Sequence, residues 1–217
     1  MTDFKGTIGR TLADSEPHFE ERPHPGDGAP NVVFVLLDDT GFAQFGCYGS
    51  DIDTPNIDGL AAGGVQFTNF HVTPVCSPTR ASLLTGRSQH AVGMRGLSGW
   101  VTGFPHSIGQ ISNAAATVAE VLRDEGYATL CAGKWHLMPG NAISAAGPFD
   151  QWPLGRGFER FYGFLPGETD QFHPELVRDN THIDPPTTPE EGYHLSEDLV
   201  DQLLQMINDN KGLRRDR

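Results

Sequence analysis

The sequence predicts an α/β fold, and three segments carry that prediction. Residues 32–37 (Val-Val-Phe-Val-Leu-Leu) form a continuous apolar run, as expected of a strand buried on both faces in a parallel sheet. A capping box opens the predicted helix 117–125, which stops before Gly126, and residues 127–131 follow as a strand. A strand, a helix and a strand in this order favour a layered α/β arrangement.

Three further helices and one more strand are predicted. Residues 54–63 read as a short helix with Pro in its first turn and Gly at its end, and residues 65–70 alternate as a strand does. Residues 78–85 form a second helix that Gly86 can close. Residues 195–210 carry apolar side chains at helical spacing, which predicts an amphipathic helix. These apolar residues are Leu199, Val200, Leu203, Leu204 and Ile207.

The chain of 217 residues is long enough for one large domain. Residues 1–30 are polar and rich in Pro, so we expect an N-terminal arm outside a body formed by residues 31–217. Residues 137–192 are rich in Pro and Gly and are expected to be mostly irregular.

The balance of charge argues against one class of partner. The chain has 28 acidic and 15 basic residues, a net charge of −13, whereas nucleic-acid binding needs a basic surface. An anionic substrate would be repelled at long range, so a site that handles one needs local cations.

The cysteines and the apolar segments indicate the cellular compartment in which the protein is expected. The three cysteines, Cys47, Cys76 and Cys131, have irregular spacing and predict neither a disulfide framework nor a zinc site. The N-terminus has no apolar core of signal-peptide length, and no run approaches the ~18 apolar residues of a membrane span. We therefore expect a cytoplasmic protein with no membrane partner.

Asp38 and Asp39 follow the predicted strand 32–37 directly. Two adjacent carboxylates at the end of a buried strand are costly without a counter-charge, and Ca²⁺ or Mg²⁺ would supply one because both prefer oxygen ligands. The carboxyl ends of parallel strands are also where α/β folds place their sites. On these residues alone, a simple turn or helix-capping pair is an equally good interpretation.

Cys76 stands out by its neighbours. A lone cysteine is most often a buried structural thiol. Here Pro78 would begin a helix directly after Cys76, which puts residue 76 at the positive end of that helix. Arg80, one turn later, would add a cation on the same face. An anionic group at position 76 would be stabilised by both, so this cysteine is a candidate nucleophile.

A third candidate segment is Gly133-Lys134-Trp135-His136, which follows the predicted strand 127–131. Lys134 offers a point charge for an anion, and His136 can exchange protons near neutral pH. Taken alone, the tetrapeptide is better explained as a loop lysine and a packed histidine.

Together these motifs resemble those of the sulfatase family, and most closely those of bacterial arylsulfatases. The matching segments are Leu-Leu-Asp-Asp-Thr-Gly-Phe at 36–42, Cys-Ser-Pro-Thr-Arg-Ala-Ser-Leu-Leu-Thr-Gly-Arg at 76–87 and Gly-Lys-Trp-His at 133–136, in the family's order. The segments Thr-Pro-Asn-Ile-Asp-Gly-Leu-Ala and Gly-Val-Gln-Phe-Thr-Asn-Phe-His lie between the first two and are also typical. The resemblance covers roughly residues 30–210.

The resemblance implies a mostly parallel central sheet with helices on both faces, as in the alkaline-phosphatase-like superfamily. It implies hydrolysis of sulfate esters of small molecules or carbohydrates. Cys76 would be oxidised to formylglycine by a formylglycine-generating enzyme, and the hydrated aldehyde would attack sulfur. Asp38, Asp39 and residue 76 would bind Ca²⁺ or, alternatively, Mg²⁺. Arg80 would stabilise the modified residue. Lys134 would bind the substrate sulfate, and His136 would hold the aldehyde hydrate.

The resemblance also implies that some of the family's active-site residues are not in this sequence. Family members continue past residue 217 and supply further metal ligands, a second His and a second Lys. We therefore expect the N-terminal portion of a sulfatase domain, with the C-terminal part absent. Two alternatives stay open: a phosphonate or phosphate ester hydrolase of the same superfamily, and an inactive fragment.

Overall fold

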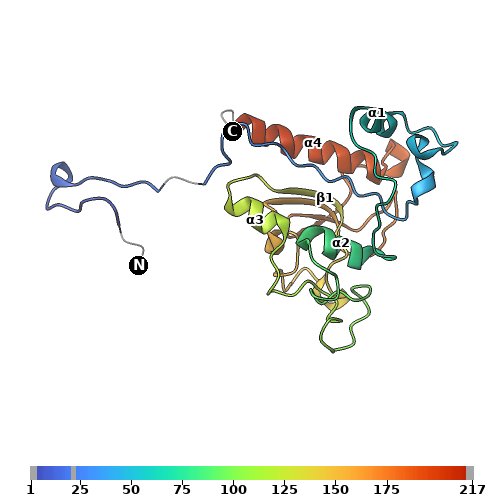
Figure 1. Cartoon of the computed structure of the whole chain (residues 1–217). Helices are drawn as coiled ribbons and strands as arrows, with labels where there is room; N and C mark the ends of the chain where they lie inside the picture. The colour runs from blue at the N-terminus through green and yellow to red at the C-terminus, as the bar shows by residue number, and fades with distance from the viewer. Residues whose placement is uncertain (1–3, 21–22, 214–217) are drawn as a thin grey trace.

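The computed structural model describes residues 4–20 and 23–213, and Figure 1 shows the arrangement of its elements. The helices are α1 (Pro55–Gly63), α2 (Cys76–Thr85), α3 (Val118–Asp124) and α4 (Leu195–Leu213). The strands are β1 (Leu130–Lys134), β2 (Arg160–Phe164), β3 (Leu176–Arg178) and β4 (Thr181–Ile183).

The four strands form one sheet in the order β1-β2-β3-β4. β1 and β2 are parallel, with Leu130 opposite Arg160 and Lys134 opposite Phe164, whereas β2–β3 and β3–β4 are antiparallel. The α/β class is therefore confirmed, but the described sheet is mixed rather than mostly parallel. The antiparallel half comes from residues 176–183, inside the region expected to be irregular.

Successive residues of β2 face two different cores, as the pleat of a strand requires. Phe161 packs with Ala81 of α2 and with Trp135, whereas the next residue, Tyr162, packs with Leu195 of α4 and its neighbours. In Figure 1 the sheet accordingly lies between α4 on one side and α2 and α3 on the other. Helices on both faces are thus as predicted.

Two segments predicted as strands, 32–37 and 65–70, are not strands in the described structure. Residues 32–37 are extended and exposed, and Val33 and Val35 keep 75% and 78% of their surface exposed. A strand exists only when a neighbour accepts and donates its backbone hydrogen bonds. Among the described residues, none pairs with either segment, so their apolar composition alone does not make them strands.

The strand after α3 begins three residues later than predicted. Gly126, at φ +87°, turns the chain out of the helix, and the Tyr127 N–H donates to the Leu122 carbonyl oxygen at 3.0 Å. This six-to-one hydrogen bond is the closing bond of a Schellman motif, so residue 127 belongs to the helix end. The predicted strand 127–131 is consequently found at Leu130–Lys134.

The four predicted helices are all present. The capping box of α3 is formed, because the Glu120 N–H donates to Thr117 Oγ1 at 3.1 Å and the Thr117 N–H donates to Glu120 Oε2 at 2.6 Å. Helix α2 begins at Cys76, two residues earlier than predicted, and Gly86 closes it in the left-handed conformation.

Helix α4 is joined to the sheet by a buried polar cluster. Asp198 Oδ2 accepts hydrogen bonds from Tyr162 Oη at 2.7 Å and from Tyr193 Oη at 3.0 Å. Of the apolar stripe predicted for this helix, Leu199 packs inward, whereas Val200 and Leu204 are 55% and 52% exposed. In the described part of the chain, no helix is long and apolar enough to cross a membrane.

The N-terminal residues run apart from the body. Figure 1 shows residues 4–20 extending away from the sheet and helices. Residues 23–24 return to the body and pass directly over Gly126, where an added Cβ would lie 2.1 Å from the Pro23 carbonyl oxygen.

Candidate active site

Five of the six predicted site residues come together where α2 begins and β1 ends. Cys76 Sγ lies 3.1 Å from His136 Nδ1. Lys134 Nζ donates to Asp38 Oδ2 at 2.6 Å, and Arg80 Nη2 donates to Asp38 Oδ1 at 3.4 Å. These contacts join residues separated by 42 to 96 positions in the sequence. We call these five residues the Cys76 cluster.

Helix α2 places Cys76 and Arg80 on one side of the cluster. Cys76 is the first residue of the helix, and Val75 before it is extended. Because the unpaired N–H groups of a helix start carry partial positive charge, an anionic group at residue 76 is favoured. Arg80 lies one turn later and donates through Nη1 to the Lys134 carbonyl oxygen, which ties the helix to the end of β1.

The other side of the cluster depends on a close approach between β1 and β2. Gly133 pairs with Gly163, and a Cβ on Gly163 would lie only 2.0 Å from the Gly133 carbonyl oxygen. Gly133 also has φ +102°, a conformation that disfavours other residues. The two glycines therefore set the backbone position from which Lys134 projects.

The pairing continues past the end of β1. The Trp135 N–H donates to the Phe164 carbonyl oxygen at 2.9 Å, and the His136 N–H donates to the Leu165 carbonyl oxygen at 3.0 Å. His136 has φ +54° and Asp39 has φ +52°, left-handed values that are uncommon for residues other than glycine. Such strained backbone concentrates at functional sites, and here it occurs at two predicted site residues.

The electrostatics of the cluster are dominated by Lys134 and Arg80. Burial alone would raise the pKa of Asp38, but the hydrogen bond and charge of Lys134, together with Arg80, hold the pKa of that carboxyl below its usual value. Burial, reinforced by the same two cations, lowers the pKa of His136 to about 4. At neutral pH the cluster therefore has two cations, one carboxylate and an uncharged imidazole facing residue 76.

The sequence profile of the Sulfatase family matches residues 30–214. The chain belongs to the sulfatase family. Human arylsulfatase A is 42% identical over 165 residues, which cover 75% of this chain and 30% of that protein. Arylsulfatase of Klebsiella aerogenes is 34% identical over 153 residues, 68% of this chain and 30% of that protein. The chain thus spans less than a third of the length of these curated relatives.

Solved structures agree with this assignment. The crystal structure of Ps i-CgsB is similar with a TM-score of 0.67 at 26% identity, over 81% of this chain and 40% of that chain. A putative sulfatase, yidJ from Bacteroides fragilis, has a TM-score of 0.63 at 25% identity, over 91% of this chain and 43% of that one.

The predicted metal ligands do not form a complete site in this sulfatase chain. Asp38 is engaged by two cations, whereas Asp39 is exposed and its side chain makes no hydrogen bond or ion pair with the described residues. Within residues 4–20 and 23–213, no group of three or more His, Cys, Asp or Glu side chains could hold a metal ion. Because Ca²⁺ takes six to eight oxygen ligands, Asp38, Asp39 and residue 76 are insufficient by themselves.

Two ring side chains from the region expected to be irregular, Trp152 and His173, are not part of the Cys76 cluster. Trp152 is fully buried in the core and donates from Nε1 to the Ala142 carbonyl oxygen. His173 is exposed on the loop after β2, with Nδ1 3.6 Å from Asp170 Oδ1.

The structure also adds two residues to the surroundings of the Cys76 cluster. Cys131, on β1, is half-buried, and desolvation raises the pKa of its thiol to about 12 despite the charge of Arg80. It is therefore a protonated packing residue. Gly167 lies against the ring of His136. Nothing in the sequence near Gly167 pointed to that contact, because the two residues are brought together only by strand pairing.

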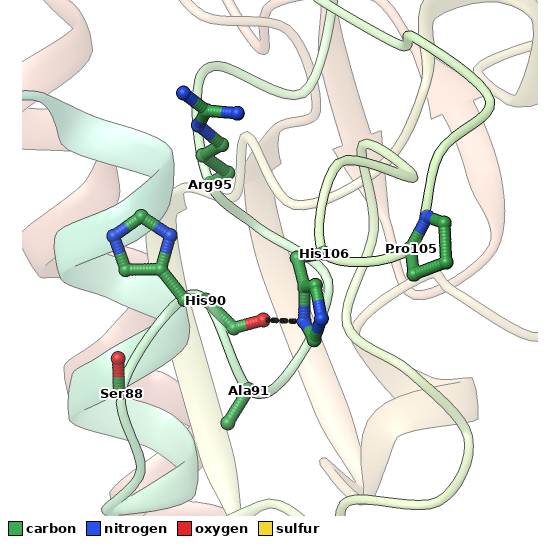
Figure 2. Close-up of a pocket in the computed structure, with 6 residues that line it drawn as sticks. All are labelled: Ser88, His90, Ala91, Arg95, Pro105 and His106. Atoms are coloured by element: carbon green, nitrogen blue, oxygen red, sulfur yellow. Dashed lines mark hydrogen bonds between the residues drawn. The ribbon is translucent and has the colours of Figure 1, made fainter.

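A hollow of about 470 Å³ lies beyond the C-terminal end of α2. Figure 2 shows His106 donating from Nδ1 to the His90 carbonyl oxygen at 2.6 Å within it. Its walls contain none of the Cys76 cluster, so this hollow is separate from the candidate active site. The lining residues are Ser88, His90, Ala91, Arg95, Pro105 and His106.

Proposed function

We propose that this chain contributes the nucleophile and the anion-binding residues of a sulfatase that hydrolyses sulfate monoesters of small molecules or carbohydrates. The observation that carries the proposal is the contact of Cys76 with His136 at 3.1 Å beside two cations. Helix α2 and the end of β1 bring these residues together from opposite sides. Membership of the sulfatase family supports the same reaction class.

Lys134 and Arg80 would neutralise the charge on the sulfate oxygens. Both side chains are nearly buried, at 9% and 12% exposure, and donors fixed in such surroundings stabilise developing negative charge better than donors in water. Their present partner is the carboxylate of Asp38, and this pairing with two anionic oxygens supports a role for both cations in binding a sulfate.

His136 would orient the nucleophile. Its lowered pKa keeps the imidazole uncharged, so one ring nitrogen is free to accept a hydrogen bond from a hydroxyl at residue 76. Nδ1 already faces that position.

Conversion of Cys76 to formylglycine by a formylglycine-generating enzyme is part of the proposal. Cys76 is partly exposed at the start of α2 and is followed by Pro78 and Arg80, as the family's modified cysteine is. The hydrated aldehyde would supply two hydroxyls on one carbon, where a thiol supplies none. Ca²⁺ or Mg²⁺ is also proposed, with Asp38, Asp39 and residue 76 giving some of its ligands, and a cytoplasmic location is proposed as well.

Intact mass tests the modification. The chain produced together with a formylglycine-generating enzyme is expected to weigh about 18 Da less than the encoded chain, the difference between a thiol side chain and an aldehyde, a product outside the usual thiol oxidation series. Joined to the C-terminal part of the domain that the resemblance implies, the converted chain should cleave an aryl sulfate faster than the matching aryl phosphate. An unchanged mass, or preference for the phosphate, contradicts the proposal.

Replacement of Lys134 by glutamine tests the anion-binding role. We expect kcat/KM for an aryl sulfate to fall by about 100-fold, because one preorganised donor is lost from the sulfate oxygens. Steady-state kinetics measure this, with the exposed Lys211→Gln change on α4 as the matched control. Equal losses in the two variants would show that Lys134 acts only through net charge.

A further inference from the structure

Gly167 lies directly beside the imidazole of His136. A Cβ built on Gly167 would be 2.6 Å from His136 Cε1, 2.7 Å from Nε2 and 3.2 Å from Nδ1. These three ring atoms are the nearest neighbours of that Cβ, and real Cβ atoms essentially never approach within 3.0 Å. The contact arises because the backbone of His136 pairs with Leu165, two residues before Gly167.

We propose that Gly167 is a positioning residue that fixes the His136 ring against residue 76. The inference rests on the proposed function, since it gives the ring its place in the reaction. The ring is confined by Cys76 Sγ at Nδ1 and by the Gly167 backbone beside Cε1 and Nε2. The main chain of His136 is fixed by its hydrogen bond to Leu165 at 3.0 Å, so the ring cannot follow a moving backbone.

A methyl group at residue 167 would therefore displace the ring. Carbon atoms in ordinary contact are about 3.5–4.0 Å apart, so the ring would have to move by roughly 1 Å. A misplacement of about 1 Å at a reacting centre can cost about 100-fold in rate. Alanine is compatible with the backbone at this position, because Gly167 is not among the positive-φ glycines. The clash with His136 is thus the dominant effect of the change.

The test compares Gly167→Ala with Gly140→Ala. Gly140 is a suitable control because a Cβ there has open space around it and its φ is not positive. NMR of the histidine Cε1–Hε1 groups reports the ring position, and the His136 resonance is identified by its loss in His136→Ala. We expect that resonance to move in Gly167→Ala and to stay in place in Gly140→Ala. In the converted enzyme, Gly167→Ala should lower kcat by about 100-fold with KM changed less than about twofold.

A double-mutant cycle gives a second readout that needs no turnover. Without the His136 ring, the methyl group added at residue 167 no longer clashes with it. Gly167→Ala should therefore lower the melting temperature of the full chain less in the His136→Ala background than in the wild-type background. An unmoved His136 resonance, or equal destabilisation in both backgrounds, overturns the positioning role. A wild-type chain that carries the aldehyde and is joined to the C-terminal part of the domain, yet cleaves no sulfate ester, overturns the proposed function instead, and with it the expected kinetic effect.

Discussion

Replacement of Cys76 by alanine is expected to abolish sulfate ester hydrolysis while leaving the fold intact. The proposed nucleophile is made from this side chain, and residues that act as a unit lose function together, so we expect a loss of about 10⁵-fold or more in kcat. The fold should tolerate the change, because Cys76 is only partly buried and the buried contacts of the first turn of α2 belong to Ser77 and Pro78. Turnover of an aryl sulfate and thermal unfolding measure the two effects.

The matched control for Cys76→Ala is Cys47→Ala. Cys47 is also partly exposed, and its backbone N–H and carbonyl group make its hydrogen bonds to Asp58 and Gln66. It should keep full turnover and the mass loss of about 18 Da, whereas Cys76→Ala should show neither. Wild-type turnover by Cys76→Ala would end the account of residue 76 as the nucleophile.

Replacement of Arg156 by alanine is expected to cause the largest loss of stability. Arg156 is 3% exposed, and its guanidinium donates to the Ala115 carbonyl oxygen at 2.6 Å and to Asn113 Oδ1 at 3.2 Å. It also pairs with Glu120 Oε2 at 3.4 Å, the carboxylate that caps α3. Removing one partner of a buried ion pair costs about 3–5 kcal/mol, and we expect the lower end because the Glu120 side chain is 27% exposed.

Chemical denaturation of the full chain measures this effect, and Arg123→Ala is its control. Arg123 is an exposed arginine in the last turn of α3, so its loss should change the free energy of unfolding by less than about 0.5 kcal/mol. Arg156→Lys keeps the charge but loses the forked geometry, and it should also destabilise the fold. If all three variants unfold alike, the buried network around Arg156 does not stabilise the protein.

The helices could be predicted from the sequence because their signals are local. The capping box of Thr117 and Glu120 and the glycine that closes α2 lie within one turn of the elements they bound. The strands were harder, since a strand depends on a partner far away in the chain. The apolar segment 32–37 is predicted as a strand but pairs with none of the described residues. The sheet instead includes Leu176–Arg178 and Thr181–Ile183, from a region predicted to be irregular.

In the candidate site too, local motifs could be predicted from the sequence, whereas contacts that depend on distant segments could not. The resemblance of short motifs predicted that Cys76, Arg80, Lys134 and His136 act together, and the structure brings them together with Asp38. The placement of Asp39 and the contact of Gly167 with His136 could not be predicted. Both follow from backbone conformation and strand pairing, which leave no pattern in neighbouring residues.

The two halves of the Cys76 cluster are anchored in different ways. His136 is held by main-chain hydrogen bonds that extend the β1–β2 pairing, whereas Asp38 is attached by the side chains of Lys134 and Arg80. Side-chain attachments of a partly exposed carboxylate are weaker than a continuous ladder, and weakly held segments open first in native fluctuations. We therefore expect thermal opening of this site to begin at Asp38, whereas the His136 imidazole keeps its place until the β1–β2 pairing itself opens.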